Sequence, residues 1–444
     1  MNSTSTDSSK TGIFYLIRAL NSHNYRLFFS GQSISLMGSW MTRVAMLWLV
    51  TRLTGSALML GIVGFAGQIP AFFLAPVAGV WIDRLDRRKL LVITQTLAMI
   101  QSLALAALAL GGIIKIWEII ALAVFQGLIN SFDMPGRQAF VVEMVEDKND
   151  LSNAIALNSS MVNLARMIGP TVAGIIIAVT GEGWCFLLDG VSYIAVIISL
   201  LLMHITVREK IPTKKGATLG QLSEGWKYVT TFMPIRIILL LLCVVALMGM
   251  PYRVLLPIYA KSILHGDAFT YGVLTAAMAV GAFTGAMLLA ARRSVLGLGK
   301  LIPTMAAVFG VGLILFAISR SVWISLPLMV MIGLGSMLVM ASCNTMLQTI
   351  VDEDKRGRVM SFYTMSVMGM MPFGSLLGGA LAHRIGITDT FIIGGAACLA
   401  GAVWFVKSLP TLRKHVRPIY REKGILPAVA KGMENAAELT VPPE

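Results

Sequence analysis

The sequence predicts an all-α polytopic membrane protein whose twelve transmembrane helices form two pseudo-symmetric six-helix bundles. Of its 444 residues, 56% are hydrophobic and 13% are charged, with a mean hydropathy of +0.78, a composition typical of membrane proteins. Apolar runs of about 18 to 25 residues recur along the chain, and each is long enough to cross a hydrocarbon core about 30 Å thick. A weak internal repeat relates the two halves of the chain.

The apolar runs define twelve predicted spans, six on each side of one long polar connection. Their limits are 27–51, 58–82, 90–112, 116–136, 154–179, 184–206, 235–260, 268–291, 300–319, 321–345, 359–383 and 387–408. The chain then begins with a cytoplasmic segment that contains an amphipathic helix (1–26), followed by a first six-helix bundle (27–207) and a cytoplasmic linker (208–234). A second six-helix bundle (235–408) and a disordered cytoplasmic tail (409–444) complete it.

Lysine and arginine collect on one side of the predicted membrane. This side receives the basic clusters at 84–89 and 355–358, the linker and the tail, whereas the other side receives few basic residues. The positive-inside rule therefore places both termini in the cytoplasm. It also explains the net charge of +14, so we expect no nucleic-acid partner.

The motifs of enzymes and metal sites are missing from the sequence. There is no nucleophile elbow, no glycine-rich phosphate loop with its lysine, and no histidine, cysteine or glutamate pattern with metal-ligand spacing. The four cysteines fall inside apolar runs, where they read as small core residues. We therefore expect neither an enzyme nor a bound metal or cofactor.

The internal repeat is carried mainly by small residues that keep register across whole helices. A shift of 211 aligns Ala57 with Ala268 and Gly61 with Gly272, and a shift of 205 aligns Gly169 with Gly374, Gly174 with Gly379 and Gly181 with Gly386. Two parallel halves related by an axis along the membrane normal give this pattern.

Charged residues inside the spans are the best pointers to a transport pathway, because each is costly in lipid unless it faces a partner or water. Met37-Gly38 and Arg43-Val44 recur as Met248-Gly249 and Arg253-Val254, one residue shorter. We expect Arg43 and Arg253 to face each other across a central cavity with Gln32 and Trp40, and to attract an anionic or polyhydroxylated substrate. The alternative is that each arginine snorkels to the interface.

Three further charged residues are candidates for coupling transport to an ion gradient. Folding the fourth and fifth spans as a hairpin brings Arg166 near residues 126–130 and Asp133, which predicts an ion pair or a hydrogen-bonded cluster. Asp189, in the sixth span, is a candidate to titrate with the proton gradient; a capped or water-facing aspartate is the alternative.

The loop Gly79-Val-Trp-Ile-Asp-Arg-Leu-Asp-Arg-Arg-Lys89 lies between the second and third spans. It resembles the loop 2–3 signature of the major facilitator superfamily of secondary transporters, which latches the two halves shut on the cytoplasmic side. The resemblance implies a gate of Gly79, Asp83, Arg84, Arg87 and Arg88. Asp83 would face the start of the eleventh helix, and Arg87 would reach Glu146 or Asp147. Asp86 departs from the family's usual glycine, and a purely topogenic basic loop is the alternative.

The fifth span contains Gly169-Pro170 and Gly174, which resembles the antiporter motif of exporters in the same superfamily. This resemblance favours efflux over uptake; ordinary small-residue packing is the alternative. In the fourth span, Ala123 occupies the place of an arginine found in typical proton-coupled drug exporters. The proton-coupling argument of those exporters therefore cannot be carried over.

Taken together, these motifs, with 38–41, 53–57, 134–140 and 153–159, resemble the bacterial branch of the superfamily that includes the enterobactin exporter, the transmembrane secretion effector group. The resemblance implies a monomeric, alternating-access permease of the bacterial inner membrane, surrounded by lipid and driven by an ion gradient, with protons as the expected coupling ion. The substrate is a small molecule and could be a siderophore, a drug or a metabolite. A lysophospholipid flippase of the same fold is the alternative, and a sensor or scaffold is a more distant one.

Overall fold

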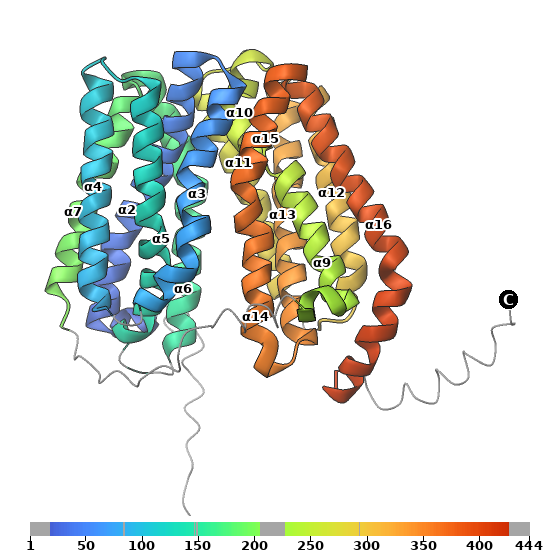
Figure 1. Ribbon diagram of the computed structural model, residues 1–444. Helices are drawn as coiled ribbons and strands as arrows, with labels where there is room; N and C mark the ends of the chain where they lie inside the picture. The colour runs from blue at the N-terminus through green and yellow to red at the C-terminus, as the bar shows by residue number, and fades with distance from the viewer. Residues whose placement is uncertain are drawn as a thin grey trace, which may run out of the picture.

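The computed structural model describes residues 18–82, 85–145, 147, 150–204, 227–292 and 294–425, and these residues form helices and connections without a β-strand. Within them, twelve helices are long and apolar enough to cross a membrane, and they stand side by side in two groups of six (Figure 1). The predicted fold class and the number of spans are therefore confirmed.

The N-terminal half consists of six spanning helices preceded by a short 3₁₀ turn, η1 (Arg18–Asn21). The helices are α2 (His23–Thr54), α3 (Ala57–Ile82), α4 (Arg87–Leu110), α5 (Ile116–Met144), α6 (Leu151–Thr180) and α7 (Glu182–Leu202). Helix α2 packs against α6 and α7, α3 packs against α5, and α4 packs against α5 and α7. The half is thus a bundle in which α2 shares one face with α7 and another with α6.

The C-terminal half repeats this arrangement with two interrupted spans. The seventh span is α9 (Met233–Val244), the π-helical turn η3 (Val245–Gly249) and α10 (Tyr252–Ser262). The eleventh is α14 (Glu353–Thr364), the π-helical turn η4 (Met365–Gly369) and α15 (Met370–Ile385). The other four are α11 (Ala268–Ala290), α12 (Leu298–Ile318), α13 (Val322–Ile350) and α16 (Ile387–Glu422).

Several helices extend beyond their predicted limits. Helix α2 already begins at His23, so residues 23–26 belong to the span and not to a surface helix. Helix α16 continues to Glu422, which corrects the prediction of a disordered tail from 409 onward. Its extension is held by side chains buried at helical spacing: Leu409, Leu412, Val416 and Tyr420. The predicted segments 1–17, 205–226 and 426–444 lie outside the described residues.

The aligned glycines occupy equivalent places in the two halves. A Cβ atom at Gly379 would lie 2.8 Å from the carbonyl oxygen of Ala57, and one at Gly174 would lie 2.8 Å from that of Ala268. Gly181 and Gly386, which each join two helices alone, both have φ of +92°, a conformation that favours glycine. The repeat in the sequence therefore corresponds to a twofold pseudo-symmetry of the structure.

The two ends of the bundle differ in charge, and we name them by their connections. The basic end carries the ends of α3, α5, α11 and α13, and the far end carries the connections 55–56, 111–115, Gly181, 263–267, 319–321 and Gly386. Figure 1 shows the basic end at the bottom and the far end at the top.

The two halves meet toward the far end and separate toward the basic end. Close contacts join Gly61 of α3 to Gly379 of α15, and Gly272 of α11 to Pro170 of α6. Farther along α6 and α11, toward the basic end, Ser159 and Thr284 are exposed. These backbone contacts between the halves therefore lie toward the far end.

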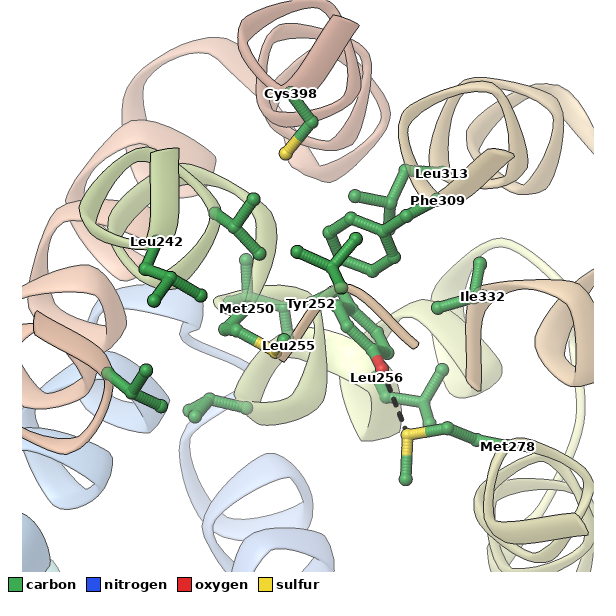
Figure 2. Close-up of a cluster of buried hydrophobic side chains, with 14 of the residues drawn as sticks. Leu242, Met250, Tyr252, Leu255, Leu256, Met278, Phe309, Leu313, Ile332 and Cys398 are labelled. Carbon is green, nitrogen blue, oxygen red and sulfur yellow. Dashed lines mark hydrogen bonds between the residues drawn. The ribbon is translucent and has the colours of Figure 1, made fainter. Parts of the chain in front are cut away.

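The core of the C-terminal half is almost entirely apolar, and it fixes the start of α10. Tyr252 is 1% exposed, and its ring meets that of Phe309 edge-on at 6.1 Å. Its hydroxyl group contacts the sulfur of Met278 at 2.9 Å, as Figure 2 shows. This packing determines the position of the next residue, Arg253.

Candidate functional site

Three arginines from both halves lie near one another in the middle of the bundle, two of them over Trp40. The guanidinium carbon of Arg43 (α2) lies 4.7 Å from the centre of the Trp40 ring, and that of Arg166 (α6) lies 5.5 Å from it. Arg253 (α10) lies over Tyr252 at 6.0 Å. The three positive charges are close enough to repel one another. We call these three residues the arginine cluster.

The arginine cluster has no acidic partner in the described parts of the chain. None of its three guanidinium groups lies within 4.0 Å of a carboxylate oxygen, and the Nε atom of Arg166 is buried without a hydrogen-bond partner. Arg43 is exposed, whereas Arg166 and Arg253 are half-buried. Unpaired cations inside a membrane bundle are expensive unless water or a ligand satisfies them. The arrangement suits a bound anion.

A glycine makes room for the aromatic ring that separates two of these cations. A Cβ atom at Gly169 would lie 2.7 Å from the Cβ of Trp40 and 3.3 Å from the carbonyl oxygen of Met37. Helix α6 can therefore approach α2 closely only at a glycine. This contact holds Trp40 where both Arg43 and Arg166 stack on it, an arrangement favoured by the negative face of an aromatic ring.

The rest of the antiporter-like motif joins the two halves. The carbonyl oxygen of Pro170 lies against Gly272 of α11, and Gly174 faces the backbone of Ala268 and Phe269. A side chain at either glycine would push α6 and α11 apart. The motif thus lies at the contact that closes the far end.

Two predictions about this region are wrong. Gln32 is only 2% exposed, so it does not line an open cavity: it belongs to the buried stripe of α2, with Phe28 and Ser35. Arg166 does not pair with Asp133. It turns toward Trp40, because the hairpin argument sets the depth of a side chain in the membrane but not its direction around the helix axis.

Asp133 of α5 is instead satisfied by groups from α4 and from its own helix. Its carboxylate accepts hydrogen bonds from Thr94 Oγ1 at 2.9 Å and from Gln95 Nε2 at 2.6 Å, and it forms an ion pair with Arg137 one turn away. The side chain is buried. This set of partners makes Asp133 a structural contact between α4 and α5.

Asp189 of α7 is buried among hydroxyl groups. Its carboxylate accepts a hydrogen bond from Ser102 Oγ of α4 at 2.7 Å and a longer one from Ser39 Oγ of α2 at 3.4 Å. The hydroxyl group of Ser39 also lies 3.2 Å from that of Tyr193. Asp189 is 1% exposed, and among the described residues no cation lies within ion-pair distance of it.

The described part of the loop-2–3 motif is anchored within the N-terminal half. Arg87 Nη1 donates to Glu143 of α5 at 2.6 Å, and Arg88 donates to the carbonyl oxygens of Leu200 and Leu201 at 2.7 and 2.6 Å. Gly79 lies in the last turn of α3, whereas Asp83, Arg84 and Glu146 lie outside the described residues.

Two details of the loop differ from expectation. Asp147 forms an ion pair with Arg18 at 3.4 Å and not with Arg87, which corrects one of the two proposed partners. Asp86, which departs from the family's glycine, is the N-cap of α4 and accepts a hydrogen bond from the backbone N–H of Lys89 at 3.2 Å. Aspartate suits this position because it satisfies an otherwise unpaired amide.

The structure also assigns residues that the sequence reasoning did not single out. Arg137 lies four residues after Asp133, a spacing that predicts an ion pair on one helix face and that could have been used. Tyr252, Ser39 and Ser102 gave no such signal, because their partners lie on other helices. In the described residues, no group of three or more histidine, cysteine, aspartate or glutamate side chains could hold a metal ion.

Comparisons with known proteins agree with this architecture. The staphyloferrin A transporter of Staphylococcus aureus is 28% identical over 384 residues, which cover 86% of this chain and 96% of that protein. The multidrug efflux pump Tap of Mycolicibacterium fortuitum is 26% identical, with 80% and 88% covered. The macrolide efflux protein A of Streptococcus pyogenes is 21% identical, with 86% and 96% covered.

Solved structures show the same fold. A nucleoside transporter is similar with a TM-score of 0.68 at 12% identity, covering 87% of this chain and 99% of its own. A bacterial homologue of the iron transporter ferroportin, in an inward-facing state, has a TM-score of 0.66 at 17% identity and covers 87% and 98%.

The family match extends over nearly all of the described chain. Residues 17–423 match the family described as transmembrane secretion effector. Together with the twelve spans and the bacterial relatives, this match identifies a multi-pass bacterial membrane protein. The chain belongs to the transmembrane secretion effector family, within the major facilitator superfamily of transporters.

Proposed function

We propose that the protein is a secondary transporter that exports a small organic anion across the bacterial inner membrane by alternating access, driven by the proton gradient. The single observation that carries the substrate class is the arginine cluster, because three guanidinium groups from both halves lie close together without an acidic partner in the described residues. Export is supported by the relatives named for macrolide and multidrug efflux.

The basic end lies in the cytoplasm in this proposal. Arg87, Arg88 and Lys89 begin α4 at this end, Arg292 follows α11, and Lys300 lies in the first turn of α12. Such basic residues stay on the cytoplasmic side of bacterial membranes. Both termini are then cytoplasmic, and substrate would enter from the cytoplasm while the basic end is open. The substrate would leave after the halves rock apart at the far end.

The loop-2–3 motif is proposed as the cytoplasmic latch. Arg87 and Arg88 tie the start of α4 to α5 and α7, so this end of the loop moves with the N-terminal half. Asp83 and Arg84 would then be carried toward the start of α14 when the basic end closes. A carboxylate is favourable near the exposed amides of a helix N-terminus.

Both halves are needed to bind the substrate in this scheme. Arg43 and Arg166 come from the N-terminal half, and Arg253 comes from the C-terminal half. An anion between them relieves the repulsion among the three cations and draws the halves together. Each charge-assisted hydrogen bond contributes about 1.5–3 kcal/mol, which corresponds to roughly 10- to 150-fold in affinity.

The proposal is tested by comparing export from a strain that lacks the protein with export from the same strain supplied with it. Mass spectrometry of cells and medium should show an acidic small molecule that leaves the cells only when the protein is supplied, and an uncoupler should abolish its release. We expect the Arg43→Gln/Arg253→Gln double variant to lose most of this export, because each half has lost a charge.

The matched control is Arg384→Gln, which removes an exposed charge at the far end. This variant should export normally. Undiminished export by the double variant at normal abundance, or release of neutral molecules alone, would contradict an anionic substrate.

A further inference from the structure

Asp189 is a buried carboxyl group for which the architecture supplies hydroxyl donors but no counter-ion. It lies two turns into α7, about 10 Å from the helix start at 1.5 Å per residue, and therefore at the depth of the hydrocarbon. An ionised carboxylate there is unstable unless a cation pairs with it or a proton neutralises it. An ionisable residue within the membrane is therefore a candidate functional site.

The groups that face Asp189 come from three helices. Gly38 and Ser39 belong to α2, Ser102 belongs to α4, and Tyr193 belongs to α7 itself. The other titratable group close to it is the thiol of Cys185, one turn away on α7. Helix α6 also packs on α7, and its one charged residue within the membrane, Arg166, is directed to Trp40.

Asp133 provides an internal comparison. It is equally buried, but it has Arg137 as a counter-ion and two further donors from α4. Its carboxylate therefore has a counter-ion in place. Asp189 differs in the one respect that decides its protonation, since the part of the chain that the structure describes brings no cation to it.

Asp189 also contacts the helix that carries the substrate cations. A Cβ atom at Gly38 of α2 would lie 2.7 Å from Asp189 Oδ1, so the carboxyl group lies directly against this helix. Ser39, which donates to the carboxylate, is next to Trp40 and one turn before Arg43. A change in charge at Asp189 therefore acts on the helix that positions two members of the central site.

From this geometry we propose that the carboxyl group of Asp189 is the binding site of the transported proton and that α2 transmits its protonation to Trp40 and Arg43. The proposal rests on the proposed function for the direction of transport. Binding forms one O–H bond on the carboxylate and removes its negative charge. One of the hydroxyl groups that donated to it then becomes an acceptor. Release to the other side of the membrane reverses these changes.

The hydroxyl groups also supply a route away from the carboxyl group. Tyr193 lies one turn closer to the basic end, and its hydroxyl group is 3.2 Å from that of Ser39. The charges of Asp133 and Arg137 act on Tyr193 from α5. A proton can pass along Asp189, Ser39 and Tyr193 toward the basic end.

Infrared spectroscopy of the purified full-length protein tests the site without any substrate. We expect the carbonyl stretch of an un-ionised carboxylic acid to appear and disappear with pH in the wild type. It should be lost in Asp189→Asn and retained in Asp133→Asn, the matched control. In Ser102→Ala, which keeps the carboxyl group and loses one donor to its ionised form, the band should persist to more alkaline pH.

Two results would overturn the proposal: a titrating band that remains in Asp189→Asn, or no such band in the wild type at any pH at which it stays folded. If Asp189→Asn fails to fold, Ser102→Ala still decides, because an unchanged titration would show that the band belongs elsewhere. Sodium-dependent changes in place of the band would mark a metal-ion site and would overturn it as well.

The coupling role is tested by export of the acidic molecule. Asp189→Asn should release it only down its own concentration gradient and should no longer respond to an uncoupler, whereas Asp133→Asn should respond as the wild type does. Wild-type protein that exports nothing would count against the proposed function, and the infrared result would still decide the site. Wild-type export that Asp189→Asn leaves fully coupled would overturn only the inference about Asp189.

Discussion

The two halves share one backbone arrangement but differ in what they bury. The N-terminal half buries Asp133, Glu182 and Asp189 together with amide side chains such as those of Gln95 and Gln101, whereas the described residues of the C-terminal half include no buried charged or amide side chain. Its polar core groups are the hydroxyls of serine, threonine and tyrosine, among leucine, methionine and phenylalanine. Symmetry therefore extends to the packing of the helices but not to their chemistry.

This difference indicates a division of labour. Backbone contacts at the paired glycines are the same in both halves, as expected of a scaffold whose two parts move against each other. The buried ionisable side chains among the described residues lie in the N-terminal half, where their burial is costly, and they are therefore expected to serve function. The C-terminal half contributes one arginine to the centre and otherwise serves as an apolar body.

Removing a buried charge partner in the N-terminal half should have the largest effect on stability. Asp133→Ala leaves Arg137 without its counter-ion and two donors without an acceptor, which costs about 3–5 kcal/mol. We expect much less folded protein, measured by fluorescence-detected size-exclusion chromatography. The double variant Asp133→Asn/Arg137→Gln should recover part of the lost folded protein. Equal amounts of folded protein for Asp133→Ala and the wild type would show that the polar core does not stabilise this half.

Removing a large buried apolar side chain from the C-terminal half should destabilise the protein as much, but it should not change the pH dependence of export. Phe309 is fully buried against Tyr252, so Phe309→Ala should cost about 3–5 kcal/mol through the cavity that it creates. The apparent melting temperature of Phe309→Ala should fall, and that of Phe309→Leu should fall by less. A changed pH dependence of export in Phe309→Leu would break the proposed division between the halves.

Equivalent glycines should give equal effects, since they occupy symmetric contacts. A Cβ atom at Gly61 would lie 2.6 Å from the carbonyl oxygen of Ser375, and one at Gly272 would meet that of Pro170. Gly61→Ala and Gly272→Ala should each disfavour the closed far end by about 1–3 kcal/mol, or roughly 5- to 150-fold. The opening of the far end is measured by the reaction of cysteines introduced there with a thiol reagent.

Gly67→Ala is the matched control for both variants, because its nearest atom would lie 3.7 Å away. It should leave accessibility unchanged. A clear effect at only one of the two symmetric glycines would contradict the twofold arrangement of contacts.

The smallest expected effect is at the N-cap of α11. Asp267 accepts from the backbone N–H of Thr270 at 2.9 Å, and this bond is the main reason that the pKa of the exposed carboxyl group lies below its usual range. Because the pKa is lowered on folding, the stabilisation is complete above the ordinary carboxyl pKa and is lost as pH falls through the lowered value. Asp267→Ala should cost about 1 kcal/mol at neutral pH.

Apparent melting temperatures of Asp267→Ala and the wild type should therefore converge in acid. Asp267→Asn, which keeps an acceptor but does not titrate, is the control. A difference that grows on acidification would contradict this account of the cap.

Sequence reasoning was most successful where it used a repeat. The aligned glycines predicted equivalent positions before any contact was visible, because close helix contacts tolerate little else. The paired arginines Arg43 and Arg253 were found in the same way. Residues whose partners lie on distant helices, such as Ser39 and Ser102 around Asp189, could not be assigned, since neither spacing nor composition relates them.

The two wrong predictions, for Gln32 and Arg166, have a common cause: the sequence gives the depth of a side chain in the membrane but not what surrounds it. Gln32 lies eleven residues before Arg43, which places both on one face of α2, but other helices cover that face at the depth of Gln32. Arg166 was assigned to Asp133 from depth alone, although the rotation of α6 turns it to Trp40. Spacing along a helix defines a face, and tertiary packing decides what that face meets.

The most direct test of the central claim is the distance between the two halves at each end. Spin labels at Ser159→Cys and Thr284→Cys report on the basic end, and labels at Thr180→Cys and His265→Cys report on the far end, in protein whose four native cysteines are alanine. We predict a second, shorter basic-end distance and, in the same condition, a longer far-end distance when the pH is changed in liposomes. One unchanged distance at both ends across all conditions would contradict a transporter whose halves alternate.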